Sequence, residues 1–275
     1  MERNQRYFLE CSYHGGDYYG WQKQPRQISV QETLEDAFTT ILGRQVEITG
    51  CGRTDTGVHA RGYVAHFNFD GEFPPNFLRR FNKFLPKDIA VHHIYPVHWD
   101  AHARFDAYHR AYEYHLVFAK DPFKQGLATH YAYAKKPDLQ RMQDAAELLL
   151  QYEEFFPFCK SNHQAKTLIC DLKRSEWVQG DHADHWVYHI ASNRFLRGMV
   201  RLIVGMCINV GTGKVTLDQV REALEQQKRL SKSTSAPPEG LYLTDIRYPY
   251  REKAGAYHAP NEVFTPNPKL DEDSE

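Results

Sequence analysis

The first 97 residues constrain the fold most, because their hydrophobic spacing switches between strand and helix periods in a fixed order. Residues 7–13 alternate with a period of two, whereas residues 30–42 repeat at helical spacing. Ser29 with Glu32 forms a capping box before that helix, and Gly43 ends it. The expected elements are strand 7–13, helix 30–42, strand 46–49, strand 63–69, helix 77–85 and strand 89–97. This β-α-β-β-α-β order predicts a ferredoxin-like unit.

The second half repeats this plan with insertions. Its expected elements are strand 112–118, helix 139–150, hairpin strands 168–178 and 185–190, buried helix 195–210, helix 216–227 and strand 241–248. We therefore expect an α+β fold of two ferredoxin-like (RRM-like) halves. They would form a mixed, mainly antiparallel sheet with helices on one side and a central active-site cleft. The expected domains are 1–100 and 101–258, followed by a polar tail at 259–275.

The segment Gly52–Ala60 carries an unusual density of functional groups between two expected strands. Asp-Thr-Gly alone is ordinary turn chemistry, so Asp55 and Gly57 could be a simple connector. Arg53, Thr54 and His59 add donors and acceptors that a turn does not need. Such a concentration on a loop indicates a functional site, with Asp55 at its centre.

The amino-acid composition limits the classes of protein to which the chain can belong. Hydrophobic residues make up 41% of the 275 and aromatic residues 13%, enough for a substantial core. No apolar run reaches membrane-spanning length and no signal-peptide pattern opens the chain, so we expect a cytoplasmic protein without a membrane segment. The net charge is −1, and the last ten residues hold one Lys and four acids (−3), which leaves about +2 elsewhere. That balance permits an RNA partner. The five scattered cysteines are expected to be reduced thiols.

The loop resembles a known signature. Arg53-Thr54-Asp55-Thr56-Gly57-Val58-His59-Ala60 closely resembles the G-R-T-D-x-G-V-H-A motif of the TruA family of tRNA pseudouridine synthases. Four further stretches are similar to that family: 18–22 with 30–32, 103–105 with 110–114, 194–205, and 236–243. Together they extend over most of the chain, from about residue 7 to residue 248.

The resemblance implies a reaction and roles for five residues. The reaction is isomerisation of uridine to pseudouridine, with Asp55 as nucleophile and Arg201 as its ion-pair partner. Tyr112 would stack on the target uracil, and Arg53 would enter the space that the flipped base leaves. His59 would belong to the substrate-binding loop, more as its brace than as an RNA contact. Whether Asp55 attacks sugar C1′ or base C6 stays open.

The resemblance also implies the setting of this reaction. The substrate would be the anticodon stem-loop of tRNA at positions 38 to 40, the enzyme a homodimer, and no cofactor or metal would be needed. Phosphate contacts are expected from exposed basic residues; the candidates are Arg79, Arg80, Lys83, Lys87, Lys160 and Lys166.

The chain departs from the family pattern at three places. Segment 155–170 is an unfamiliar version of the stretch before the hairpin, Asp106 replaces a small hydroxyl residue, and Glu113 replaces a basic one. These departures affect the expected RNA contacts and the target position. They leave the proposed catalytic groups in place.

Two other functions compete. His182, His185 and His189, or Cys159, His163 and Cys170, suggest a zinc hydrolase, but neither set has the tight paired spacing of a zinc site. A catalytically inactive RNA-binding protein of the same fold is the stronger alternative. The combination of Asp55, Tyr112 and Arg201 favours the enzyme, because binding an anionic polymer requires no carboxylate.

Overall fold

The computed structural model describes residues 5–133, 136–160 and 167–249, and the chain divides into two compact units. The first holds described residues up to Tyr108 and those from Thr244 onward. The second consists of the described residues between His109 and Leu243. The chain thus leaves the first unit after Tyr108 and returns to it within its last strand, β9 (Leu241–Arg247).

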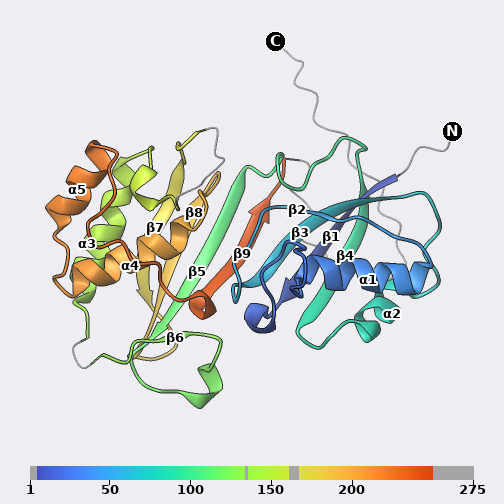
Figure 1. The fold of residues 1–275 in the computed structure, drawn as a ribbon, viewed down its shortest axis with the longest axis horizontal. Helices are drawn as coiled ribbons and strands as arrows, with labels where there is room; N and C mark the ends of the chain where they lie inside the picture. Colours follow the sequence, from blue (N-terminus) through green and yellow to red (C-terminus); the bar gives the residue numbers. More distant parts are fainter. Residues whose placement is uncertain (1–4, 134–135, 161–166, 250–275) are drawn as a thin grey trace, which may run out of the picture. The chain divides into compact units, whose positions relative to one another are not determined.

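The first unit follows the predicted order of elements (Figure 1). In chain order they are β1 (Gln5–Tyr13), the 3-10 turn η1 (Gly15–Asp17), α1 (Val30–Leu42), β2 (Thr49–Gly50), β3 (His59–Phe69), α2 (Phe77–Phe84) and β4 (Ile89–Val97). Helix α1 begins as the capping box predicts, since the Ser29 hydroxyl accepts the Glu32 amide at 3.2 Å. It ends at Gly43, which has a left-handed φ of 70°.

Both helices of this unit cover the same face of its sheet. The strands lie in the order β4-β1-β3 with β2 beside β3, and all these pairs are antiparallel. Phe38 of α1 packs on Phe67 of β3 and on Phe77 and Phe81 of α2, with ring centroids 4.5 to 5.9 Å apart. Helices α1 and α2 accordingly lie in front of these strands in Figure 1.

The second unit has a similar alternation of strands and helices. Its elements are β5 (His109–Val117), η2 (Pro122–Lys124), β6 (Thr129–His130), α3 (Leu139–Leu148), η3 (Leu149–Gln151), η4 (Phe156–Phe158), β7 (Leu172–Gln179), β8 (His185–Ser192), α4 (Met199–Gly211), α5 (Leu217–Glu225) and η5 (Pro238–Gly240). The expected hairpin is present as β7 and β8, and Thr216 and Gln219 form a complete capping box for α5.

The sheet of this unit has one face under helices. Its order is β9-β5-β8-β7, antiparallel between β5, β8 and β7, with the short β6 parallel to β5. Ser175 of β7 donates to the carbonyl of Ala146 on α3 and contacts the hydroxyl of Tyr188 on β8. The amide of Trp177 donates to Gln143 of α3. Because side chains alternate along a strand, the neighbours of these residues face away from the helices.

Several elements differ from their predicted bounds, and for two of them the structure shows the physical reason. The strand expected at 46–49 is only Thr49–Gly50, because α1 side chains take the backbone groups of Ile48. Glu35 accepts its amide at 3.1 Å and Gln31 donates to its carbonyl at 3.0 Å. The helix expected from residue 195 begins at Met199, because Gly198 has a φ of 71° that an α-helix cannot contain.

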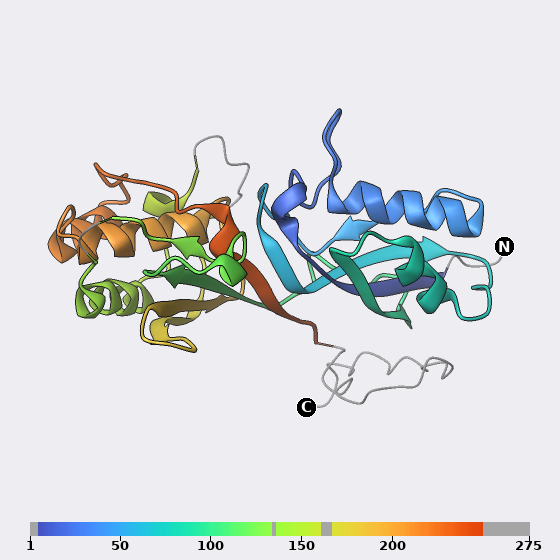
Figure 2. The same ribbon diagram turned by 90° about the horizontal axis from the view of Figure 1, so that it is seen from below.

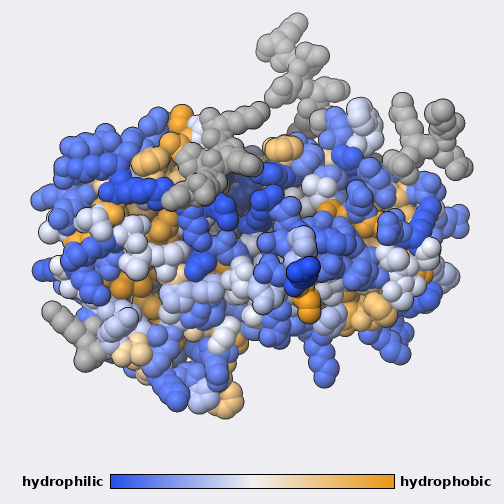
Figure 3. Space-filling view, viewed as in Figure 1, coloured by the Kyte–Doolittle hydropathy of each residue, from blue (hydrophilic) through white to orange (hydrophobic). Residues whose placement is uncertain are grey.

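The visible surface is mainly hydrophilic. Most residues on the face shown in Figure 3 are hydrophilic, and the hydrophobic ones form small scattered groups. Within the described residues, no helix combines the length and the apolar character needed to span a membrane. The expected tail at 259–275 lies outside the described residues.

Candidate active site

Asp55 stands at the first position of a tight turn between β2 and β3. The amide of Val58 donates to the carbonyl of Asp55 at 3.1 Å, and Gly57 has a φ of 79°. That is the pattern of a type II turn, which requires a left-handed residue at its third position. The Asp-Thr-Gly sequence is therefore a turn, as its composition indicates, and the turn presents the Asp55 side chain partly to solvent.

The segment after η1 holds this turn from one side. The amide of Gly57 donates to the carbonyl of Tyr18 at 3.3 Å, and the amide of Trp21 donates to that of Thr54 at 3.4 Å. Gly20 has a φ of 85°, and a Cβ there would lie 2.3 Å from the Thr54 carbonyl oxygen. Only glycine allows this close approach. Beyond it, a narrow loop leading to α1 projects from the unit (Figure 2).

Buried aromatic side chains support the turn from below. The Tyr13 hydroxyl and the Thr54 hydroxyl form a buried hydrogen bond of 2.9 Å, and the Tyr63 hydroxyl donates to the Gly52 carbonyl. Trp21 is 2% exposed and stacks on Tyr63 at 3.8 Å, so it belongs to this support. Burial raises the pKa of Tyr63 well above its usual value, which keeps the hydroxyl a donor. The result is a rigid base under Asp55.

His59 lies inside the first unit at the start of β3. It is 1% exposed, and its Nδ1 accepts the amide of Gly15 at 3.0 Å. An accepting Nδ1 places the proton of the neutral ring on Nε2. The ring also packs against His14, with centroids 4.4 Å apart. His59 is thus held inside the unit by its contact with η1, whereas Arg53, two residues before Asp55, is exposed.

Tyr112 and Arg201 belong to the second unit. Tyr112 is partly exposed on β5, opposite Ile190 of β8, and its ring meets that of Phe195 edge to face at 5.2 Å. Arg201 lies in the first turn of α4, and its Nε donates to the carbonyl of Ala236 at 2.6 Å. The Arg201 carbonyl in turn accepts the Ala236 amide at 2.9 Å. Both side chains are therefore held by their own unit.

Tyr114 lies on β5, where alternation predicts a core residue or a cross-strand partner but does not reveal its hydrogen bonds. It is buried, but its hydroxyl contacts Thr129 at 2.7 Å and donates to the Pro237 carbonyl at 3.0 Å. Tyr114 and Arg201 thus hold successive carbonyls of the segment before β9. Two signals were available, namely the tyrosine pair in the 110–114 motif and the prolines at 237 and 238.

These two units can be compared with known proteins. A sequence model described as tRNA pseudouridine synthase matches residues 11–106 and 148–249. The chain belongs to this family. The tRNA pseudouridine synthase A of Bacteroides fragilis is 43% identical over 247 residues, covering 89% of this chain and 97% of that protein. The same enzyme of Porphyromonas gingivalis has the same identity and coverage, and that of Limosilactobacillus fermentum is 34% identical, covering 88% and 96%.

The segments matched by the synthase model include four of the five candidate residues. Asp55, Arg53, His59 and Arg201 lie inside the matched segments, whereas Tyr112 lies in the stretch between them. The alignments with whole relatives leave only about a tenth of the chain uncovered, and they are long enough to include Tyr112. Its assignment therefore depends on its position in the strand motif of residues 110–114.

The residues that depart from the synthase pattern have local partners. The Asp106 carboxylate accepts the amide of His102 at 2.8 Å, so it stabilises a turn. Glu113 lies on the helix-free face of β5 beside His115 and His189.

Most of the basic residues expected to contact phosphate lie at the surface. Four are exposed on and after α2, namely Arg79, Arg80, Lys83 and Lys87, and Lys160 is partly exposed. Lys166 and His163 lie outside the described residues.

Proposed function

We propose that this chain isomerises uridine to pseudouridine in tRNA. The observation that carries the proposal is the Asp55 turn. It lies within the family match, and hydrogen bonds to its backbone and to the buried Thr54 hydroxyl hold the turn that presents the partly exposed Asp55 side chain. A reaction that only exchanges bonds on one nucleotide needs such a positioned group, because orientation supplies much of the rate enhancement.

The chemistry assigns a task to Asp55. Isomerisation breaks the N1–C1′ bond of uridine, turns the base, joins C5 to C1′, releases the C5 proton to water and leaves N1 with a proton taken from water. A carboxylate nucleophile divides this into two easier steps by forming a covalent intermediate at C1′ or C6, and the bond to Asp55 is broken again before the product leaves. No electron leaves the substrate and no group is transferred elsewhere, so the reaction balances without a cofactor.

We propose the following roles for the other candidates. Arg201 forms an ion pair with Asp55 and keeps it ionised, since a nearby cation favours the charged form. Tyr112 stacks on the target uracil, and the exposed Arg53 fills the space left by the flipped base. His59 positions the loop from inside the unit through its bond to Gly15. Family membership and the local settings of these side chains support these roles.

The finer assignments also belong to the proposal. The substrate is the anticodon stem-loop of tRNA at positions 38 to 40, and the enzyme works as a cytoplasmic homodimer. Each half of the chain is ferredoxin-like. The strand orders β4-β1-β3-β2 and β9-β5-β8-β7 support this, because each arises from a β-α-β-β-α-β order with its first strand between the fourth and the third.

The decisive experiment uses tRNA carrying tritium at C5 of uracil. The wild-type chain should release the label into water as C5 bonds to C1′, and Asp55→Asn should lower that release by at least about a thousand-fold. Binding of tRNA should stay nearly unchanged, because the variant removes one negative charge and no contact to phosphate.

Asp70→Asn is the matched control. Asp70 is an acid of the same unit at the end of β3 and pairs with Arg44 at the surface, so its variant should keep full activity. Label release by Asp55→Asn at the wild-type rate would refute the nucleophile. No release by the wild-type chain, with tRNA still bound, would favour the catalytically inactive RNA-binding protein.

A further inference from the structure

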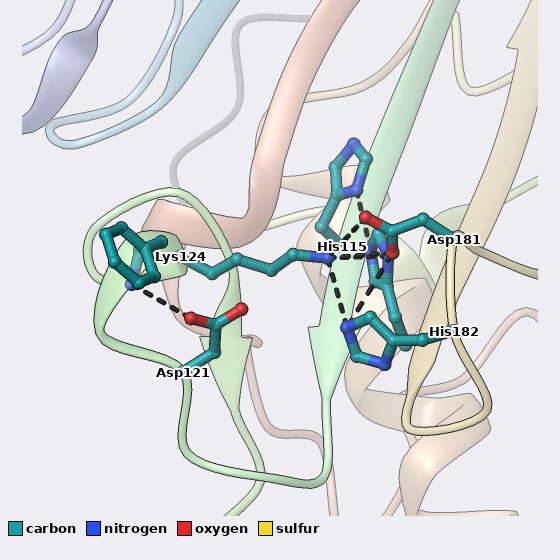
Figure 4. Close-up of polar contacts among 7 residues, drawn as sticks. His115, Asp121, Lys124, Asp181 and His182 are labelled. Atoms are coloured by element: carbon teal, nitrogen blue, oxygen red, sulfur yellow. Dashed lines mark hydrogen bonds and ion pairs between the residues drawn. The ribbon is translucent and has the colours of Figure 1, made fainter.

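A cluster of imidazole and charged side chains occupies the face of the second unit that its helices leave open (Figure 4). His115 of β5 lies on this face because its neighbour Tyr114 points toward the helices. His185 stands at the start of β8, and Asp181 and His182 lie in the turn before it. Lys124 reaches them from η2. All five side chains belong to the second unit.

The ammonium group of Lys124 stands where the donor atoms of the cluster converge. Its Nζ lies 2.8 and 2.9 Å from the two carboxylate oxygens of Asp181, 3.3 Å from Nε2 of His182 and 3.1 Å from Nδ1 of His185. An ammonium has three donors and no acceptor. In the tautomers that leave Nε2 of His182 and Nδ1 of His185 unprotonated, these ring nitrogens turn lone pairs toward it, as they would toward a metal ion.

The ring N–H groups of this arrangement point away from the Lys124 ammonium. With Nδ1 of His185 accepting, its Nε2 carries the proton and donates to Nδ1 of His115 at 3.0 Å. The Nε2 of His115 lies 3.3 Å from the Glu113 carboxylate. Metal-binding histidines characteristically pass their other N–H to such an outer partner, which fixes the tautomer.

Asp181 and His185 are also in direct contact. Asp181 Oδ1 accepts a hydrogen bond from Nδ1 of His185 in the tautomer that carries the ring proton on Nδ1. In the other tautomer both atoms bear lone pairs, and the Lys124 ammonium lies within hydrogen-bonding distance of each.

We propose that Asp181, His182 and His185 form a binding site for a divalent transition-metal ion of the zinc class, with the Lys124 ammonium as its internal competitor. Two imidazoles and one carboxylate are a donor set that zinc accepts. Their three donor atoms all lie within 4.8 Å of one another, and bonds of about 2.0–2.1 Å would place tetrahedral ligands roughly 3.3 Å apart. Asp181 and His182 are 64% and 42% exposed in a turn, so they can close this difference.

The histidines that lie together in the structure are not those that the sequence places on one strand face. From the sequence, His185 and His189 would share a face of a strand, and His182 would fall in the turn before it. In the structure the turn brings His182 to His185 and adds Asp181, whereas His189 lies 3.6 Å from Glu113. The site is independent of the proposed isomerase activity, and no step of that reaction uses it.

The test measures binding of Zn²⁺ and Co²⁺ to the full chain by titration calorimetry and by the visible absorption of bound Co²⁺. Lys124→Met removes the competing ammonium and keeps the apolar stem. We expect this variant to bind one ion per chain at least tenfold more tightly than the wild type. A cluster that is only a surface salt bridge would gain no metal affinity from the loss of its lysine.

The ligands are tested in the Lys124→Met background. Adding His182→Ala or Asp181→Asn should weaken binding at least tenfold, and both residues are exposed, so the fold should persist. Adding His92→Ala, which removes an exposed histidine of the first unit, should change nothing. Equal affinity of the wild type and Lys124→Met, or binding that is insensitive to His182→Ala, would overturn the proposal.

Discussion

His66 shows how one buried side chain makes the first unit sensitive to acid. It lies on β3 with 6% of its surface exposed, and its Nδ1 accepts the amide of Ala103 at 3.2 Å. Burial, the nearby Arg6 and His102 lower its pKa from 6.5 to about 4. The folded chain therefore keeps His66 neutral at pH values where the unfolded chain protonates it.

The sign of the pH dependence follows. The free energy of unfolding is unaffected by His66 above pH 6.5 and falls as pH decreases toward 4, because the unfolded state then binds the extra proton. Between pH 7 and pH 5 the loss from this residue should be about 2 kcal/mol. Urea denaturation at both pH values should show a smaller loss for His66→Gln, while the exposed His92→Gln should behave like the wild type. An unchanged pH dependence in His66→Gln would contradict this account.

At the scale of elements, the sequence predicted those that its hydrophobic period controls. The strand Ile89–Val97 and the start of α1 at Val30 have their expected bounds. The short β2 does not, because Gln31 and Glu35 side chains occupy the backbone of Ile48. Such a side-chain capture leaves no periodic signal in the sequence, so only the structure reveals it.

The core between α1 and α2 yields a prediction for this scale. Phe38 is fully buried and contacts aromatic rings of β3 and α2. Phe38→Ala should lower the free energy of unfolding by roughly 3–5 kcal/mol, through lost burial and the cavity left behind. Thr40→Ala, at an exposed position of the same helix, should change it by less than about 0.5 kcal/mol. Equal effects in chemical denaturation would show that the two helices do not share this core.

The candidate site likewise has one part that the sequence predicted and one part that it did not. The turn at Asp55 was visible in the sequence because its glycine and its polar residues are contiguous. The support by Tyr13, Gly20 and Tyr63 was not, because those residues reach the turn from other parts of the fold. The hydroxyl of Tyr114 is a further example, since alternation identifies a core position without revealing its hydrogen bonds.

At the scale of the whole molecule, the cysteines report on both units at once. Cys11 and Cys51 are buried in the first unit, and Cys159, Cys170 and Cys207 are buried in the second. Burial raises the pKa of Cys207 to about 12 and that of Cys170 to about 11, and it raises that of Cys11 well above its usual value. Thiolate is the reactive form, so these thiols should be inert at pH 8 on two grounds, protonation and burial.

We therefore expect Ellman's reagent to modify fewer than about one thiol per native chain within minutes at pH 8, and all five after denaturation in urea. Peptide mapping of partly labelled samples at intermediate urea assigns each reactive thiol to its unit. Labelling of Cys11 and Cys51 before the other three would show that the first unit opens at lower urea, because each thiol becomes accessible only when its own core opens. Rapid modification of any one cysteine in the native chain would contradict the closed core described for its unit.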